Sequence, residues 1–131
     1  MKKQPEIIEW FKKAENDFKA ACDLSDRPED PLPDIVCYHC QQACEKYLKA
    51  FLVSKGKDPP RVHDLDSLLD LLTEEEMSLN QLRKIIEPLT PYAVEYRYPG
   101  EWATDEEAQD ALLRTTQIRE FIGQRLNLIT G

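Results

Sequence analysis

The hydrophobic pattern of residues 34–55 predicts a long helix around which the rest of the chain is arranged. The segment contains no Gly or Pro before Lys55, and most of its residues are good helix formers. Its apolar positions recur at helical spacing and form one stripe of Cys37, Cys40, Cys44, Leu48 and Phe51. A second stripe is polar and consists of Gln42, Glu45, Lys46 and Lys49. We expect the apolar stripe to be buried among other helices, whereas the polar stripe faces either water or a ligand.

The N-terminal part of the chain shows a second helical pattern over residues 5–24. Its predicted buried stripe is Ile7, Phe11, Ala14, Phe18 and Ala21. Residues 25–33 contain three prolines and three acids, which indicates a loop. Gly56 is the expected C-terminal cap of the central helix, and residues 57–62 with their two adjacent prolines indicate an extended connector.

The C-terminal part predicts three further helices. The first is short, begins near His63 or Asp64, and packs through Leu65, Leu68, Leu69 and Leu72. A capping box at residues 73–76 is a possible start for the next helix, which we place at about residues 78–87 with Leu82, Ile85 and Ile86 inward. Pro88 and Pro91 are expected to break or kink it, after which residues 92–98 continue in the same direction. The last helix is expected to begin after a Thr104 capping box, following a turn at residues 99–100, and to end at about Leu128.

These patterns indicate one all-α domain over residues 1–131. No segment alternates like a strand, and we find neither an internal repeat nor a low-complexity tract. The predicted architecture is an up-and-down four-helix bundle with one short additional helix.

Charge and composition narrow the class of partner. The chain has 17 basic and 25 acidic residues and a net charge of −8, which argues against tight nonspecific binding of duplex nucleic acid. A local basic patch remains possible, made of Lys46, Lys49, Lys55, Lys57 and Arg61. No apolar run has the length of a membrane helix, and the N-terminus lacks the apolar stretch of a signal peptide. We therefore expect a cytoplasmic protein that does not contact the membrane.

The motif CYHCQQAC at residues 37–44 places four potential metal ligands within eight residues, and His63 could supply a further one. Cys37, Cys40 and Cys44 share one helical face, but His39 points elsewhere on the helix. Cysteine is often buried as a small apolar side chain. We therefore expect reduced core cysteines, with no metal and no cofactor.

Four motifs in the chain resemble, in the same order, those of the HEPN domain family. QQACEKYLKAFL at residues 41–52 is similar to the central helix of that family, which reads Q-Q-x-x-E-K-x-x-K-A. Residues 14–21 resemble the A-x-x-D-x-x-x-A core of its first helix. His63-Asp64-Leu65 resembles the H-D-L that opens its third helix, and residues 97–99 resemble its R-Y-P. The resemblance covers nearly the whole chain and implies a helical bundle that pairs as a homodimer.

The resemblance also implies a function in binding. HEPN proteins often occur beside a minimal nucleotidyltransferase, as in a toxin–antitoxin pair, and have been thought to bind nucleotides. It therefore implies a binding module for that partner, or for a nucleotide or RNA. The residues that we expect to make the contacts are His63, Tyr96 and Arg97, together with Lys46. The alternatives are that His63 is a local structural partner, that Arg97 forms a structural ion pair, and that the polar stripe is a solvated face.

The second hypothesis is a metal-independent endoribonuclease toxin. In the RNase members of the HEPN superfamily, an Arg is followed a few residues later by a His. Arg97 is followed by Tyr-Pro-Gly-Glu-Trp-Ala, and the two histidines, His39 and His63, both precede it. We therefore expect no catalytic residue in this chain.

Overall fold

The computed structural model describes residues 3–93 and 99–129, and these residues form an all-α bundle. The long helices are α1 (Lys3–Ser25), α2 (Pro33–Ser54) and α5 (Asp105–Arg125). Between α2 and α5 lie α3 (Leu65–Glu75) and a composite helix, in which α4 (Arg83–Ile86) is flanked by the 3-10 helices η1 (Met77–Leu82) and η2 (Glu87–Ala93). No strand occurs in the described ranges, so the predicted all-α class is confirmed.

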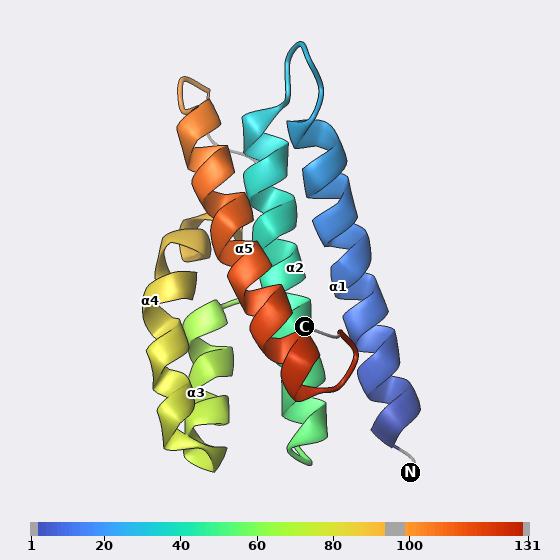
Figure 1. Ribbon diagram of the computed structural model, residues 1–131. Coiled ribbons are helices and arrows are strands. Elements are labelled where there is room, and N and C mark those ends of the chain that lie inside the picture. The colour runs from blue at the N-terminus through green and yellow to red at the C-terminus, as the bar shows by residue number, and fades with distance from the viewer. Residues whose placement is uncertain (1–2, 94–98, 130–131) are drawn as a thin grey trace.

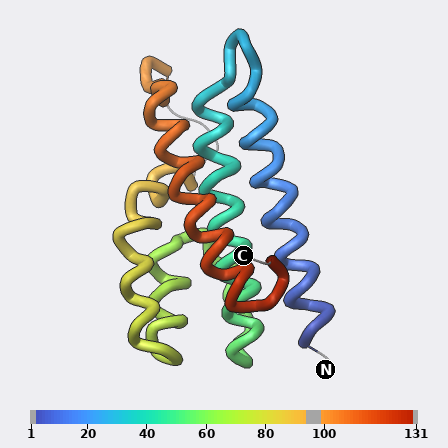
Figure 2. The backbone as a smooth tube through the Cα atoms, viewed as in Figure 1, coloured from blue at the N-terminus to red at the C-terminus, as the bar shows by residue number. Residues whose placement is uncertain are grey.

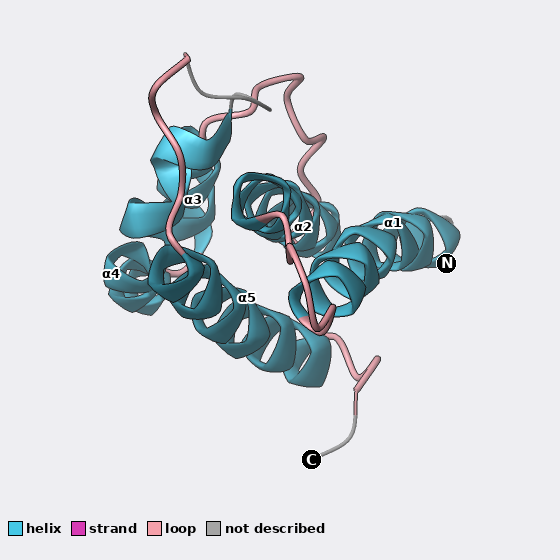
Figure 3. Cartoon of the chain, turned by 90° about the horizontal axis from the view of Figure 1, so that it is seen from above, coloured by secondary structure: helices cyan, strands magenta, loops and turns pink. Residues whose placement is uncertain are grey.

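The helices run up and down around α2. The chain ascends in α1 and returns in α2, and a connector then leads back to α3 (Figures 1 and 2). The composite helix runs antiparallel to α3, and α5 descends along the other helices to the C-terminal segment (Figure 1). Seen from above, α2 lies between α1 on one side and α3 and α5 on the other (Figure 3). Contacts with α1, α3, η2 and α5 make α2 the central element of the bundle.

The ends of α2 follow directly from its sequence. Pro33 lies in its first turn, where a missing N–H costs nothing. Gly56 has φ 84°, a conformation that glycine adopts without steric cost. Its N–H donates to Val53 O at 3.0 Å, and Lys57 N–H donates to Leu52 O at 3.0 Å. This pair of bonds is a Schellman motif, so the predicted glycine cap is confirmed.

The predicted packing faces are buried in most positions. All five residues of the apolar stripe on α2 and all four predicted leucines of α3 belong to the core. In α1 the stripe is buried except for Phe18, which is half-buried. The Thr104 capping box is present in full, with the Glu107 side chain accepting from Thr104 N–H at 2.8 Å. Gly100 has φ 94° in the turn that Pro99-Gly100 predicted.

Two predictions about the C-terminal half were wrong. The capping box at residues 73–76 does not start a helix, because Thr73 lies inside α3 and its hydroxyl donates to Asp70 O at 2.8 Å. The expected regular helix at residues 78–87 is instead mostly 3-10, with only four α-helical residues. Pro88 lacks an N–H donor, which prevents the α-helical ladder from continuing through η2. Leu82 and Ile86 are buried as expected, whereas Ile85 is half-buried.

The last helix ends at Arg125, slightly before the expected residue. Asn127 adopts a left-handed conformation with φ 59°, and the chain folds back on α5. The N–H groups of Leu128 and Ile129 donate to Gly123 O at 2.8 and 3.1 Å. A Cβ on Gly123 would lie 2.4 Å from Ile129 Cδ1, so this close approach requires glycine. Among the described helices, none has the length and apolar character needed to cross a membrane.

Candidate functional site

The polar stripe of α2 is only partly exposed. Glu45 and Lys49 are 3% and 5% exposed, and Gln42 and Lys46 are half-buried. The interpretation of this stripe as a solvated face is therefore wrong for Glu45 and Lys49. Burial of charged groups is costly unless they are paired, so the partners of these two residues define the site.

Glu45 is at the centre of one cluster, which we call the Glu45 centre and which comprises Glu45, Lys49 and His63. Lys49 Nζ donates to Glu45 Oε2 at 2.9 Å from one turn further along α2. His63 Nδ1 lies 3.2 Å from each of the two carboxylate oxygens. The side chain of Glu45 is 4% exposed, whereas that of His63 is 72% exposed. In this centre, an exposed imidazole is therefore within hydrogen-bonding distance of a buried carboxylate.

Two residues that the sequence interpretation did not single out support this centre. Gln41 is fully buried, and its Nε2 donates to the backbone carbonyl of His63 at 2.9 Å. Trp10 of α1 places its ring 5.4 Å from Lys49 Nζ, at cation–π distance. The contact of Gln41 could have been suspected from the sequence, because Gln41 is the first residue of the Q-Q pair. Nothing in the sequence around Trp10 indicates its contact with Lys49. The connector carrying His63 is therefore attached to α2 through both its backbone and its side chain.

Lys46 belongs to a different cluster from His63. Its Nζ bonds to Asp17 Oδ2 of α1 at 2.5 Å, and His39 Nδ1 bonds to Asp17 Oδ1 at 2.9 Å. Lys46 and His63 therefore contact separate carboxylates, Asp17 on α1 and Glu45 on α2. Tyr96 and Arg97, the other two predicted contact residues, lie outside the described residues.

A third carboxylate, Glu15, joins the three long helices. We call Glu15, Tyr47 and Arg119 the Glu15 centre. Tyr47 donates to Glu15 Oε1 at 2.5 Å, and Arg119 donates to Oε1 and Oε2 at 2.6 and 3.0 Å. Burial by itself would raise the pKa of Glu15, but the hydrogen bonds and charge of Arg119 and the Tyr47 hydroxyl outweigh it and hold the pKa below its usual value. Burial, and the ionised Glu15 beside it, raise the pKa of Tyr47.

The lysines of the predicted basic patch are paired with acids. In addition to the two ion pairs on α2, Lys55 bonds to Glu76 at 2.9 Å and Lys57 lies 3.5 Å from Glu74. Glu76 also accepts from Arg125 at 2.6 Å, and the hydrogen bonds from Arg125 and Lys55 lower its pKa to about 2. Arg61, the fifth residue of the patch, is exposed. Positive charge in this region is therefore largely neutralised within the chain.

Three of the four cysteines pack in the core as predicted, whereas Cys22 is half-buried. Cys37, Cys40 and Cys44 are buried, and Cys44 Sγ lies 3.6 Å from Thr115 Oγ1 in the contact with α5. Burial raises the pKa of the Cys40 thiol and raises that of Cys44 to about 12. These thiols are protonated near neutral pH and are poor ligands. Within residues 3–93 and 99–129, no three His, Cys, Asp or Glu side chains are grouped so as to hold a metal ion.

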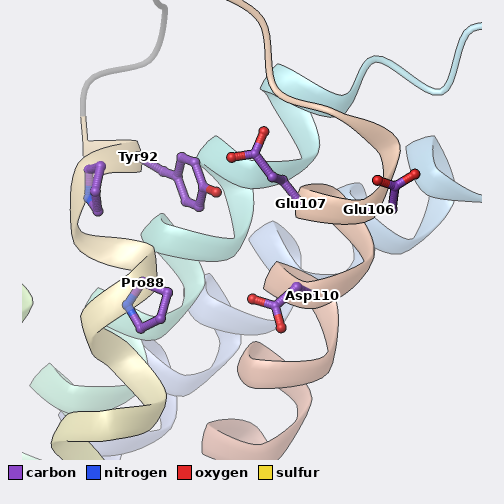
Figure 4. Close-up of a pocket in the computed structure, with 6 residues that line it drawn as sticks. Pro88, Tyr92, Glu106, Glu107 and Asp110 are labelled. Carbon is purple, nitrogen blue, oxygen red and sulfur yellow. The ribbon is translucent and has the colours of Figure 1, made fainter.

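A surface cavity of about 570 Å³ separates η2 from the start of α5. Tyr92 and two prolines line one wall, and Glu106, Glu107 and Asp110 line the other (Figure 4). Glu107 forms part of the capping box, and Asp110 accepts from Arg114 at 2.7 Å. Acids in the first turns of a helix stabilise its N-terminus, which accounts for this acidic wall without a ligand.

The fold and the Q-Q motif agree with the comparison to known families. The model of the HEPN domain matches residues 7–126. Searches of curated proteins and of solved structures gave no match. Because the family model covers nearly the whole chain, this protein belongs to the HEPN domain family.

Proposed function

We propose that this chain is a cytoplasmic, non-catalytic HEPN binding module that forms a homodimer and binds a minimal nucleotidyltransferase as its protein partner. The contact surface is the accessible part of the polar stripe, Gln42 and Lys46, together with the exposed His63. The pairing of Lys46, Lys49, Lys55 and Lys57 with carboxylates carries this proposal. Tight RNA binding gains its free energy mainly by neutralising phosphates with unpaired cations. A surface of paired charges is better suited to a protein, which can offer both signs of charge.

A nucleotide or a short RNA is the second candidate ligand. The observation in its favour is the His63 imidazole, whose side chain is 72% exposed. A single imidazole can contact one phosphate, so this ligand would bind more weakly than one held by several cations. The predicted contribution of Tyr96 and Arg97 to this contact stays a prediction.

The proposal is tested first by co-expression with a minimal nucleotidyltransferase encoded beside this chain. A complex that survives size-exclusion chromatography, and that is weakened by His63→Ala and by Lys46→Ala, supports the proposal. Leu113→Ala on α5 is a matched control, because Leu113 is exposed and lies away from the polar stripe. If the genome has no such neighbour, or if the two proteins do not associate, the proposed partner is wrong.

Thermal melting with nucleotides and short RNAs distinguishes the second candidate. A ligand at 100 times its Kd stabilises the folded state by roughly 2.7 kcal/mol, which is readily detected as a rise in Tm. A rise that Arg97→Ala abolishes, with the RNA intact afterwards, supports nucleotide binding. Cleaved RNA would instead support the alternative of an endoribonuclease toxin.

A further inference from the structure

The two histidines of this chain are held in the same way by a carboxylate. His39 Nδ1 bonds to Asp17 at 2.9 Å, and His63 Nδ1 lies 3.2 Å from both oxygens of Glu45. An ionised carboxylate can only accept a hydrogen bond, so Nδ1 carries the proton in each ring. The other nitrogen, Nε2, therefore keeps its lone pair in the neutral ring.

The two rings differ in access to solvent. The side chain of His63 is 72% exposed and that of His39 is 28% exposed. His39 also has the Tyr38 ring against it, with the ring centroids 5.5 Å apart. Only His63 combines a fixed tautomer with room for a bulky reagent at Nε2.

Two contacts orient the support beneath His63. Glu45 is buried and bonds to Lys49 at 2.9 Å, which favours the carboxylate orientation that faces the imidazole. Gln41 fixes the backbone of His63 through its carbonyl at 2.9 Å. A nucleophile oriented by a second group that is itself held in place is the arrangement used in covalent catalysis.

We propose that His63 Nε2 is a nucleophile that accepts a phosphoryl group from a phosphoramidate-type donor, in which phosphorus is bonded to nitrogen. The Nε2 lone pair attacks phosphorus, the new N–P bond forms, and the bond from phosphorus to the protonated donor nitrogen breaks. The donor leaves as a neutral amine, so atoms and charge balance. The positive charge that develops on the imidazole is stabilised by the Glu45 carboxylate, while the Nδ1 proton stays in its hydrogen bond. The reaction uses the same imidazole as the proposed partner contact but does not require the partner to be bound.

The proposal is tested by incubating the purified protein with potassium phosphoramidate near neutral pH. Site-specific mass spectrometry gives the rates of phosphorylation at His63 and at His39, which serves as an internal control in the same molecule. We expect His63 to react faster than His39 because its side chain is 72% exposed and that of His39 only 28%. Compared with a free peptide of residues 61–66, which lacks Glu45, we expect a rate about tenfold higher, the lower end of what a carboxylate contributes behind a metal-bound histidine. Equal rates at the two histidines, or a rate at His63 no greater than in the peptide, would overturn the proposal.

A variant series separates the effect of Glu45 from that of exposure. Glu45→Gln should slow the reaction at His63 about tenfold while leaving His39 unchanged, since only one carboxylate has been removed. Because this variant leaves Lys49 buried without its partner, the double variant Glu45→Gln/Lys49→Met provides a second test in a chain without the buried charges. Circular dichroism verifies that both remain folded. An unchanged rate in either folded variant would show that exposure alone accounts for the reaction.

Discussion

The Glu15 centre and the Glu45 centre are two carboxylate clusters whose partners come from different parts of the fold. Glu15 receives hydrogen bonds from Tyr47 and Arg119, so its three members come from α1, α2 and α5. Glu45 receives one bond from its own helix and one from His63 on the connector. The first cluster links packed helices, whereas the second ends at an exposed imidazole.

This difference separates structural from available polar groups. A polar cluster whose members lie on different helices contributes directly to the fold, because breaking it removes contacts between those helices. A cluster whose last member faces solvent can exchange that contact for a ligand without moving a helix. The Glu15 centre therefore joins the three long helices, and the Glu45 centre holds an exposed imidazole in place.

The largest effect is expected for Lys49→Met, which removes the buried cation of the Glu45 centre. Methionine preserves the length of the side chain and its packing beside Trp10, but leaves Glu45 buried with only the exposed His63 as a partner. Breaking a buried pair on one side typically costs about 3 kcal/mol. Urea unfolding at neutral pH measures this loss of the free energy of unfolding.

Lys46→Met is the matched control for this prediction. Lys46 is also on α2 and also pairs with a carboxylate, but its side chain is 25% exposed. Solvent screening limits the expected loss to about 1 kcal/mol or less. The double variant Glu45→Gln/Lys49→Met should recover much of the stability lost in Lys49→Met. Equal losses in the two single variants would remove the distinction between a buried pair and a half-exposed pair.

Tyr47→Phe tests the Glu15 centre with a smaller expected effect. The substitution keeps the fully buried ring and its contact with Phe11, whose centroid is 5.1 Å away, but removes the hydroxyl donor to Glu15. Hydrogen bonds to charged groups contribute about 1.5–3 kcal/mol, and Arg119 still neutralises Glu15, so we expect a loss of about 1.5 kcal/mol. A thermal melt of the variant beside the wild type measures it. No change in Tm would mean that this centre does not hold the helices together.

The sequence predicted the long helices and their faces because local rules determine them. The α2 stripe, the Gly56 cap and the Thr104 capping box each depend on residues a few positions apart. Residues 77–93 were harder, because two prolines permit several local conformations and tertiary packing selects the mixture of 3-10 and α turns.

The polar contacts were predicted less well because they join distant parts of the chain. Glu15 and Arg119 are 104 positions apart, and no periodic pattern relates them. Glu45 and Lys49 both belong to the predicted polar stripe of α2, but their buried ion pair beside Trp10 was found only in the structure. His63 was predicted as a ligand-contact residue and that role stays a prediction, whereas its partner Glu45 was identified only in the structure.

Acid should weaken the Glu15 centre over a defined range of pH. The pKa of Glu15 is lower in the folded state than its ordinary value of 4.5, so its contribution to stability is complete above pH 4.5 and is lost as pH falls through the folded-state pKa. The free energy of unfolding should therefore fall with pH by less than roughly 1.4 kcal/mol per pH unit, the value for one fully bound proton. The slope stays below this value because Glu15 is partly exposed. Urea titrations between pH 7 and pH 3 should therefore show a shallower dependence below pH 4.5 for Glu15→Gln than for the wild type. Parallel curves would contradict the role given to this carboxylate.

The smallest effect on stability is expected for His63→Ala, and this variant tests the comparison most directly. The imidazole is 72% exposed, and Glu45 keeps its ion pair with Lys49 when the ring is removed. Exposed side chains outside structural networks usually change stability by less than about 0.5 kcal/mol. If urea unfolding shows such a small change, while phosphorylation or partner binding is lost, the imidazole is available for function. A loss comparable to that of Tyr47→Phe would instead make His63 a structural partner of Glu45, and the two centres would then have the same role.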